Sequence, residues 1–398
     1  MMASGPDSLI DERPVRGTRP SNRRELIIAA AARLFYRQGF TRTSMGEIAE
    51  AVAIGPSALY RHFRSKGDLL KTVVDDSFAS MRDRIAQLDS GEFDELADGF
   101  APVLVKNREI GVLWRRESRN LEASVRAEAQ EQVREVAGSL AGLISIGRPD
   151  LTADDADLLS WCVFGVATSI SFHQLNLPHD QLVALLVELV DSVLHVELPE
   201  PEEPSPPTPD AMPSRHSRRE TILATAIQLF SQHGYSQVGM EDIGAAVGIA
   251  GPSVYNHFSS KADLLIVGTV RSAEWLRMDL LQALRVATDP VDGLCRLLRS
   301  YSSFVLASPY LVDLLITELD QLAEADRRRA RQAQLDYIGE WVHLLQSVHP
   351  EMDAVSARIR VQATLSMMSD VALILRLRQR PGLAAEIAAV GARILAVD

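Results

Sequence analysis

One short stretch of side chains suited to binding phosphates and bases occurs twice in this chain. Leu59 to Lys66 reads Leu-Tyr-Arg-His-Phe-Arg-Ser-Lys, and Val254 to Lys261 reads Val-Tyr-Asn-His-Phe-Ser-Ser-Lys. Arginine can bond guanine through two parallel hydrogen bonds, and asparagine can bond adenine in the same way. A lysine at the start of a helix adds its charge to that of the helix N-terminus, and both favour a phosphate. The stretch therefore predicts binding to a nucleic acid.

The repeat extends well beyond this stretch. With a constant offset of 195 residues, about 22 of the 48 positions from Arg23 to Leu70 are identical in the second copy. Repeat proteins are built from units of about 20–50 residues, so a period this long indicates the duplication of a whole domain.

The residues before the stretch predict two helices that would position it. Glu25 to Gln38 has apolar residues at helical spacing, and Gly39 follows as a helix-terminating glycine. Ser44 and Glu47 form a capping-box pattern, which starts a second helix that runs to about Val52.

A third and a fourth helix are predicted across the stretch itself. Gly55-Pro56 precedes a short helix expected over Ser57 to Phe63, because proline suits the first turn of a helix. Ser65 then caps a fourth helix of about twenty residues. Helix, tight turn and short helix together are the signature of a helix-turn-helix.

Charge is distributed unevenly along the sequence. The net charge is −12, yet Arg13 to Lys71 holds twelve Lys and Arg against four acidic residues. The matching stretch, Arg215 to Leu265, holds four basic residues against four acidic ones. A basic segment on an acidic protein is the electrostatic footprint of phosphate binding, and the second copy lacks it.

These residues resemble the TetR family of bacterial transcription repressors. The family pattern is Phe-x-x-x-Gly-Phe/Tyr, then Ile-Ala, then Leu-Tyr-x-His-Phe-x-Ser-Lys. It is matched at Phe35 to Phe40, Ile48-Ala49 and Leu59 to Lys66, and again at Phe230 to Tyr235, Ile243 and Val254 to Lys261. The duplicated layout is similar to the double-TetR repressors of actinobacteria that control mammalian-cell-entry and lipid operons. The resemblance implies an all-α fold with two tandem units, each a three-helix helix-turn-helix domain followed by a helical ligand-binding and dimerisation domain.

Residue types and resemblance together give candidate DNA contacts. Ser57, Ala58 and Arg61 would face bases, while Tyr60 and His62, by resemblance, would bond phosphate oxygens. The alternative to DNA contact is a structural role, namely helix capping for Ser44 and packing for Tyr60 and His62. The full candidate set is Thr43, Ser44, Ser57, Ala58, Tyr60, Arg61, His62, Lys66, Ser253, Tyr255, Asn256, His257 and Lys261.

The second copy departs from the first at informative positions. Asn256 replaces Arg61, which would move the preferred base from guanine toward adenine. Val238-Gly239 replaces Thr43-Ser44. The Gly-Pro pair, Gly251-Pro252, lies one position closer to the repeated tyrosine than in the first copy, so the short helix that carries Tyr255 is expected to begin one residue later. Ala53 stands where Gly248 and the family have a turn glycine, which puts the first turn's geometry in question. The two copies should therefore read different half-sites, with stronger phosphate binding by the first.

Domain boundaries follow from composition. Seven prolines fall from Pro199 to Pro213, a composition typical of an extended linker. The expected segments are a disordered arm at 1–20, a DNA-binding domain at 21–70, a helical ligand and assembly domain at 71–196, a Pro-rich linker at 197–215, a second DNA-binding domain at 216–265 and a second ligand and assembly domain at 266–398.

Four apolar helical segments are candidates for assembly, because in TetR proteins the last two helices form the dimer interface. They are Leu158 to Leu175, Gln181 to Val196, Val355 to Leu377 and Leu383 to Val397. Pairing of the two halves within one molecule would give an internal pseudo-dimer. A homodimer of chains with four DNA-binding domains is the alternative.

Ligand contacts are less well defined by the sequence. Candidate liners of a pocket are Trp114, Trp161, Phe164, Phe304 and Trp341, with simple core packing as the alternative for each. The charged run Arg115 to Arg119 could bind a phosphate of an acyl-CoA-type ligand, or form a solvated helix face.

The sequence argues against several other classes of protein. It has no Gly-rich phosphate loop, no metal-spaced His/Cys cluster and no Gly-x-Ser-x-Gly elbow, so we expect no enzyme activity, no cofactor and no metal. Cys162 and Cys295 are expected to pack as small apolar side chains. The polar N-terminus and the Ser/Thr-interrupted segment Leu158 to Phe172 predict a cytoplasmic protein that does not enter a membrane.

The sequence therefore predicts a DNA-binding transcription repressor that recognises an asymmetric double-stranded operator. A small apolar or acyl-type effector would release it from DNA. The alternative is a ligand-binding or scaffold protein whose second helix-turn-helix no longer binds DNA.

Overall fold

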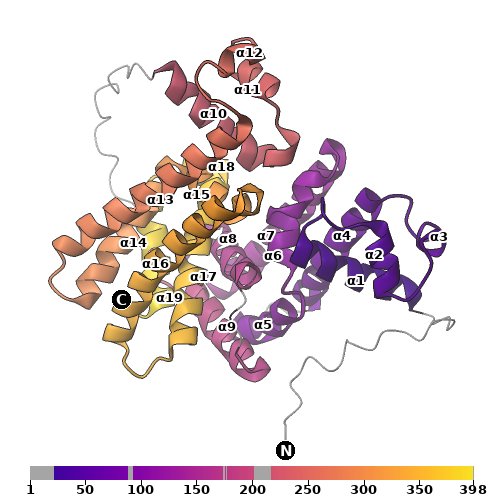
Figure 1. The fold of residues 1–398 in the computed structure, drawn as a ribbon. Coiled ribbons are helices and arrows are strands. Elements are labelled where there is room, and N and C mark those ends of the chain that lie inside the picture. Colours follow the sequence, from indigo (N-terminus) through magenta and orange to yellow (C-terminus); the bar gives the residue numbers. More distant parts are fainter. Residues whose placement is uncertain (1–21, 88–92, 174, 176, 201–216, 398) are drawn as a thin grey trace, which may run out of the picture. The chain divides into compact units, whose positions relative to one another are not determined.

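The computed structural model describes residues 22–87, 93–173, 175, 177–200 and 217–397 (Figure 1). Every regular element in these ranges is helical, which confirms the predicted all-α fold. The predicted arm at 1–20 and most of the predicted linker lie outside the described residues. Within the described ranges, no helix is both long and apolar enough to cross a membrane.

The protein forms two compact units, and the division does not follow the predicted domain boundaries. Unit 1 comprises Met1–Gly147 and Asn176–Val187. Unit 2 comprises Arg148–Leu175 and Glu188–Asp398, so it includes two segments of the first half of the sequence.

Unit 1 is organised around one long helix. Its helices are α1 (Arg23–Gln38), α2 (Met45–Ala51), α3 (Pro56–Leu59), α4 (Lys66–Gln87), η2 (Phe93–Glu95), α5 (Leu96–Lys106), α6 (Ile110–Arg115), η3 (Glu117–Asn120) and α7 (Ala123–Gly147). Helix α4 contacts α1, α5, α6 and α7. It buries Val73, Phe78 and Met81 among them, so the DNA-binding helices and the following bundle share one core.

Unit 2 contains the second half of the sequence and part of the first. Its helices are α8 (Ala153–Ser169), η4 (Ile170–Phe172), the end of α9 (His179–Leu194), α10 (Arg218–His233), η5 (Tyr235–Gln237), α11 (Met240–Ala246), α12 (Gly251–Val254), α13 (Lys261–Arg285), α14 (Pro290–Ala307), α15 (Pro309–Thr317), η6 (Leu319–Gln321), α16 (Glu324–Val348), α17 (Ala354–Leu373), α18 (Leu375–Arg378) and α19 (Leu383–Leu395). Helix α13 corresponds to α4 and packs against α14, α15 and α16.

The most extensive helix pairing in unit 2 is between α8 and α17, which come from different halves of the sequence (Figure 1). Gly165 of α8 lies directly against the backbone of Met367 in α17. Nearly the whole length of both helices is buried, including Cys162. The predicted assembly segments therefore do contact each other within one molecule.

The duplication continues through both ligand domains, although no sequence pattern reveals it there. Helices α7 and α16 are both 25 residues long, and they begin at Ala123 and Glu324. The N-caps of α8 and α17 are Thr152 and Asp353, which keeps the same offset of 201 residues. The offset is 195 in the DNA-binding domains, so the second half carries six additional residues between α13 and η6.

Candidate nucleic-acid interface

The local signals of the first helix-turn-helix form as predicted. Gly39 ends α1 with φ +85°, and its N–H donates to Phe35 O. The Ser44 hydroxyl accepts from Glu47 N at 3.1 Å, and the Glu47 carboxylate accepts from Ser44 N at 2.7 Å, so the capping box is complete. We call residues 22–70 the first head and residues 217–265 the second head.

The third helix of each head is shorter than predicted. Helix α3 ends at Leu59, where Ser57 to Phe63 was expected to be helical, and the backbone continues as a turn in which His62 N donates to Leu59 O. The expected late start of the equivalent helix was wrong, because α12 begins at Gly251, the position equivalent to Pro56. Proline is tolerated at either of the first two helical positions, since neither N–H has an intrahelical acceptor.

This geometry exposes the residues that were expected to contact DNA. Leu59 and Phe63 are buried, which fixes the turn between them. Tyr60, with 53% of its surface exposed, projects from this turn together with exposed Arg61 and His62. In the second head Tyr255 is equally exposed, at 53%, beside exposed Asn256 and half-buried His257. Ser57 is exposed, whereas Ala58 and Ser253 are half-buried.

Thr43 faces the interior, contrary to the expectation of a phosphate contact. Its side chain is 1% exposed, and its hydroxyl donates to Gly39 O at 2.9 Å. The adjacent Ser44 is exposed and uses its hydroxyl in the capping box. The Thr43 hydroxyl thus bonds backbone carbonyls inside the head, so it cannot reach a phosphate.

The two lysines of the repeated stretch also bind the protein's own backbone. The Lys66 ammonium donates to Phe40 O at 2.7 Å and Thr43 O at 2.9 Å, and it lies 4.3 Å from the centre of the Phe40 ring. Lys261 repeats the arrangement with Tyr235 O and Val238 O, both at 2.9 Å. Burial lowers the pKa of both ammonium groups. These contacts hold the turn before α2 and α11, and they differ from the phosphate contact expected of both lysines.

The repeated arginines at the start of α1 and α10 brace the heads internally. Arg23 donates to Val52 O at 3.0 Å, and Arg218 donates to Val247 O at 3.3 Å. Arg24 lies over the Phe63 ring, as its counterpart Arg219 does over the Phe258 ring. No local sequence pattern indicates these roles, because the partners are 29 or 39 residues away.

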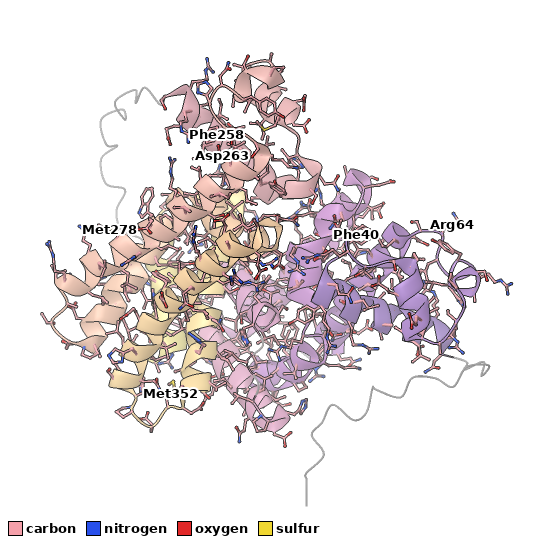
Figure 2. The ribbon with its side chains drawn as sticks, viewed as in Figure 1. Phe40, Arg64, Phe258, Asp263, Met278 and Met352 are labelled. Carbon is pink, nitrogen blue, oxygen red and sulfur yellow. The ribbon has the colours of Figure 1, made fainter. Side chains whose placement is uncertain are left out.

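The arginines that are not repeated have a different environment. Arg42, Arg61 and Arg64 are exposed in the first head, and Figure 2 shows Arg64 projecting from it. The second head has Gln237, Asn256 and Ser259 at these positions. Repeated cations thus bond the scaffold, whereas the three exposed arginines that are not repeated belong to the first head.

Residues 27–73 and 222–267 each match the family described as "Bacterial regulatory proteins, tetR family". The two segments contain the helix-turn-helix of each head and the start of the helix that follows. Both heads of this chain therefore contain a segment that matches the TetR family.

Known transcription regulators are similar to part of this chain. The HTH-type transcriptional activator FasR of Mycolicibacterium smegmatis is 33% identical over 91 residues, which are 23% of this chain and 42% of that protein. The HTH-type transcriptional regulator AcrR of Shigella flexneri is 44% identical over 50 residues, or 13% of this chain and 23% of that protein. The chain therefore spans less than half the length of these relatives. A solved TetR-family regulator from Bordetella parapertussis has 21% identity and a TM-score of 0.40, over 44% of this chain and 91% of that one.

The TetR turn between α2 and α3 has the same backbone in both heads despite different residues. Ala53 adopts φ +55° and Gly248 adopts φ +71°, and each N–H donates to the carbonyl three residues earlier. The left-handed region costs an alanine about 1–2 kcal/mol, whereas glycine enters it without penalty. The question that the sequence raised about the first turn is therefore answered: its geometry is normal, and Ala53 is strained.

Exchanging these two residues should change the stability of the heads in opposite directions. We expect Ala53→Gly to stabilise the first head by about 0.5–1 kcal/mol, after allowance for the greater freedom of glycine in the unfolded protein. Gly248→Ala should destabilise the second head by about 1 kcal/mol. A Cβ at Gly248 would have no atom within 4 Å, so only backbone conformation changes. Hydrogen exchange of the amides in each head measures both effects, and the unaltered head of each variant is the control. If both substitutions changed stability in the same direction, Ala53 would not be strained.

One buried carboxylate joins the first TetR head to the helices that follow it. Glu117 in η3 is 3% exposed, and its Oε2 accepts from Phe40 N at 2.8 Å. Arg116 donates to Glu117 Oε1 at 2.5 Å and to Tyr36 O at 3.2 Å. The charged run Arg115 to Arg119, considered above as a ligand-phosphate site, thus includes residues that attach the end of α1 to the bundle.

The five candidate ligand residues lie in four separate aromatic contacts. Trp114 in unit 1 packs edge-on against Phe78. In unit 2, Trp161 contacts Phe164, Phe304 contacts Trp275, and the fully buried Trp341 contacts Tyr301 and Tyr337. Phe164, Phe304 and Trp341 are buried, whereas Trp114 and Trp161 are half-buried. A ligand role for any of the five stays a prediction.

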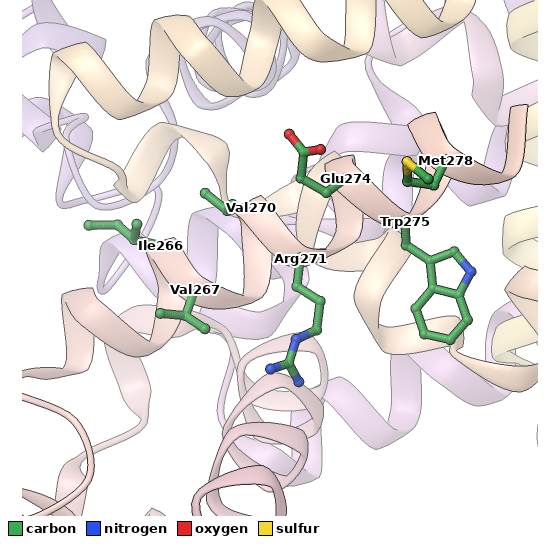
Figure 3. Close-up of a pocket in the computed structure, with 7 residues that line it drawn as sticks. All are labelled: Ile266, Val267, Val270, Arg271, Glu274, Trp275 and Met278. Carbon is green, nitrogen blue, oxygen red and sulfur yellow. The ribbon is translucent and has the colours of Figure 1, made fainter. Parts of the chain in front are cut away.

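An open apolar groove runs along α13 in unit 2. Its seven lining residues lie between Ile266 and Met278, and Trp275 and Met278 are among the exposed ones (Figure 3). Arg271 crosses it to pair with Glu220 of α10, with Nη2 3.0 Å from Oε1. The equivalent face of α4 carries Asp75, Asp76 and Asp83. The apolar face is therefore particular to the second copy.

Proposed function

We propose that this protein is a sequence-specific, DNA-binding transcriptional regulator, most simply a repressor, with two non-equivalent heads. The observation that carries the proposal is the difference in role between repeated and unrepeated residues of the heads. Repeated residues such as Lys66 and Lys261 hold the scaffold, whereas the exposed residues differ at Arg61 and Asn256. Duplication followed by change at exposed positions that can face bases or phosphates, such as Arg61 and Arg64, suits one reader of an asymmetric operator.

The pairing of α8 with α17 supports two heads per molecule. TetR regulators usually act as dimers, and here the corresponding surfaces of the two halves pack together within unit 2. An internal pseudo-dimer would present two helix-turn-helix motifs to one operator. Heads of this kind bind successive major-groove faces only when spaced by about 34–36 Å.

A small apolar or acyl-type effector is proposed to control this spacing. Glu117 supports the coupling in the first half, because it bonds the head through Phe40 N and belongs to η3, directly after α6. A ligand that binds better to a bundle in which η3 is displaced would shift the population away from the DNA-binding spacing. The residues proposed to contact this ligand are the five aromatic candidates alone.

Matched substitutions of the exposed tyrosines test the proposal. Operators would first be selected from a random duplex pool with the full-length protein, and affinity and footprints then compared for Tyr60→Ala and Tyr255→Ala. Each should weaken binding about tenfold, the value of a lost hydrogen bond to a charged group, and each should remove protection from one half-site only. Ile146→Ala, which removes an exposed side chain from α7, is the control and should change nothing.

Two results would contradict this function or narrow it. Selection that yields no preferred sequence would remove the claim of specific DNA binding. If Tyr60→Ala weakens binding while Tyr255→Ala changes neither affinity nor footprint, the second head does not touch DNA. The scaffold alternative, motivated by the neutral charge of that head, would then be preferred.

A further inference from the structure

Three ion pairs between described residues join the two halves of the sequence inside unit 2, and these three have the same polarity. They are Asp155 with Arg380, Asp157 with Arg376 and Glu188 with Arg360. In each pair the acid comes from the first half and the base from the second. At these three contacts the first half therefore presents only acidic side chains and the second half only basic ones.

The first pair is well buried and part of a small network. The Arg380 side chain is 17% exposed, and its Nε donates to Glu386 Oε2 at 2.8 Å while Nη2 also reaches Asp155. Burial raises the pKa of Asp155, but hydrogen bonds from Thr152 and Arg380 outweigh burial and hold the pKa below its ordinary value. Asp155 is therefore stabilised as an anion at this interface.

The other two pairs are more exposed, because the Arg376 side chain is 53% exposed and the Glu188 side chain 63% exposed. Arg376 Nη2 lies 2.9 Å from Asp157 Oδ1, and its guanidinium lies 5.8 Å from the centre of the Trp161 ring. Arg360 is 12% exposed at its side chain, bonds Glu188 and donates to Ile394 O at 3.0 Å. Both arginines thus have a second contact that fixes their position.

The internal duplication shows what each charge would meet in a pairing of identical halves. With the offset of 201 residues, the three acids Asp155, Asp157 and Glu188 correspond to Ser356, Arg358 and Ala389. By the same offset, the three bases Arg360, Arg376 and Arg380 correspond to Leu159, Leu175 and His179. None of the three ion pairs therefore has a symmetry mate on the other side of the interface.

Pairing of identical halves would lose all three ion pairs. Two first halves would place Glu188 opposite Leu159, which is fully buried in the observed pairing. Two second halves would place Arg376 opposite Arg358, a like-charge contact. Like charges in contact disfavour an interface, and so does a largely buried carboxylate such as Asp155 once it has lost its arginine.

We propose that these six side chains make the two halves a matched pair, so that the assembly surface of the first half accepts the second half and rejects another first half. The tether between the halves then favours the second half of the same molecule, because its effective concentration is high. The functional particle is one molecule with two heads. This inference names the partner of the assembly surface in the proposed regulator, but its test reads mass and does not depend on DNA binding.

Charge reversal in the full-length protein tests this selection. The acid-reversed variant carries Asp157→Arg and Glu188→Arg, so both of its halves are basic at these sites. The arginine-reversed variant carries Arg360→Glu and Arg376→Glu, so both of its halves are acidic. A third variant carries all four changes and restores opposite charges with the polarity reversed. Native mass spectrometry at low ionic strength gives the number of molecules in each particle.

The proposal expects a specific pattern of masses. The wild-type protein and the four-change variant should be monomers. Mixing the acid-reversed with the arginine-reversed variant should give a 1:1 heterodimer, since each half then finds its opposite only in the other molecule. The heterodimer population should exceed that of either homodimer by about 10–100-fold.

Two outcomes would overturn the proposal. The first is a wild-type protein that dimerises through identical halves. The second is that both two-change variants are monomers, unfold at the same temperature as the wild-type protein and form no heterodimer when mixed. If neither two-change variant folds, the four-change variant decides. A four-change variant that folds supports the proposal, and one that does not fold overturns it.

Discussion

Gly165→Ala should destabilise unit 2 by about 3 kcal/mol, the upper end of the usual cost of overpacking a core. A Cβ at Gly165 would lie 2.6 Å from Met367 Cα and 3.3 Å from Met367 Cβ. The nearer atom belongs to backbone, so no side-chain rotation can relieve the contact. Helices α8 and α17 would have to move apart, and the buried faces of both would lose their packing.

Gly142 of α7 provides the matched control for this substitution. It also lies within a helix, but a Cβ there would meet no atom within 4 Å. Gly142→Ala should therefore be neutral or stabilising by up to about 1 kcal/mol, the difference in helix propensity. Hydrogen exchange of the α8 and α17 amides separates the two cases. Wild-type protection in the Gly165→Ala protein would show that this close crossing does not hold the halves together.

Local signals made much of the fold predictable from the sequence. The capping box of Ser44 and Glu47 and the terminating Gly39 act over three or four residues, so their patterns are visible without tertiary contacts. The length of α3 was not predictable in this way. The change from helix to turn after Leu59 has no counterpart in the residue pattern, because Leu59 and Phe63 are spaced as on one face of a continued helix.

Residues that look alike in sequence proved to serve opposite roles, and only tertiary contacts distinguish them. Lys66 and Arg61 are both cations of the repeated stretch, yet the first bonds backbone carbonyls 23 and 26 residues away. The pairing of Asp155 with Arg380 spans 225 residues, which no local pattern reveals. The duplication of the ligand domains was likewise hidden, because helix lengths and caps are kept while side chains have diverged.

Arg61→Ala should reduce affinity for the selected operator by about 10–100-fold and should relax the base preference at one position. A bidentate arginine–guanine contact contributes about 1–3 kcal/mol of discrimination against other bases. Arg61 is exposed at the end of the turn after α3, and its replacement removes no core contact. The loss should therefore appear in DNA binding alone, with the melting of the protein unchanged.

Reciprocal exchange of Arg61 and Asn256 tests whether each residue selects a base. Arg61→Asn should move the preferred base of the first half-site toward adenine, and Asn256→Arg should move that of the second toward guanine. Arg64→Ala is the control, since an exposed arginine that meets only phosphate should weaken all sequences equally and lower the salt dependence by about one ion. Base frequencies from repeated selections decide between these effects. Unchanged base preferences in both exchanged proteins would mean that neither Arg61 nor Asn256 reads a base, and the asymmetry of the heads would then rest on phosphate charge alone.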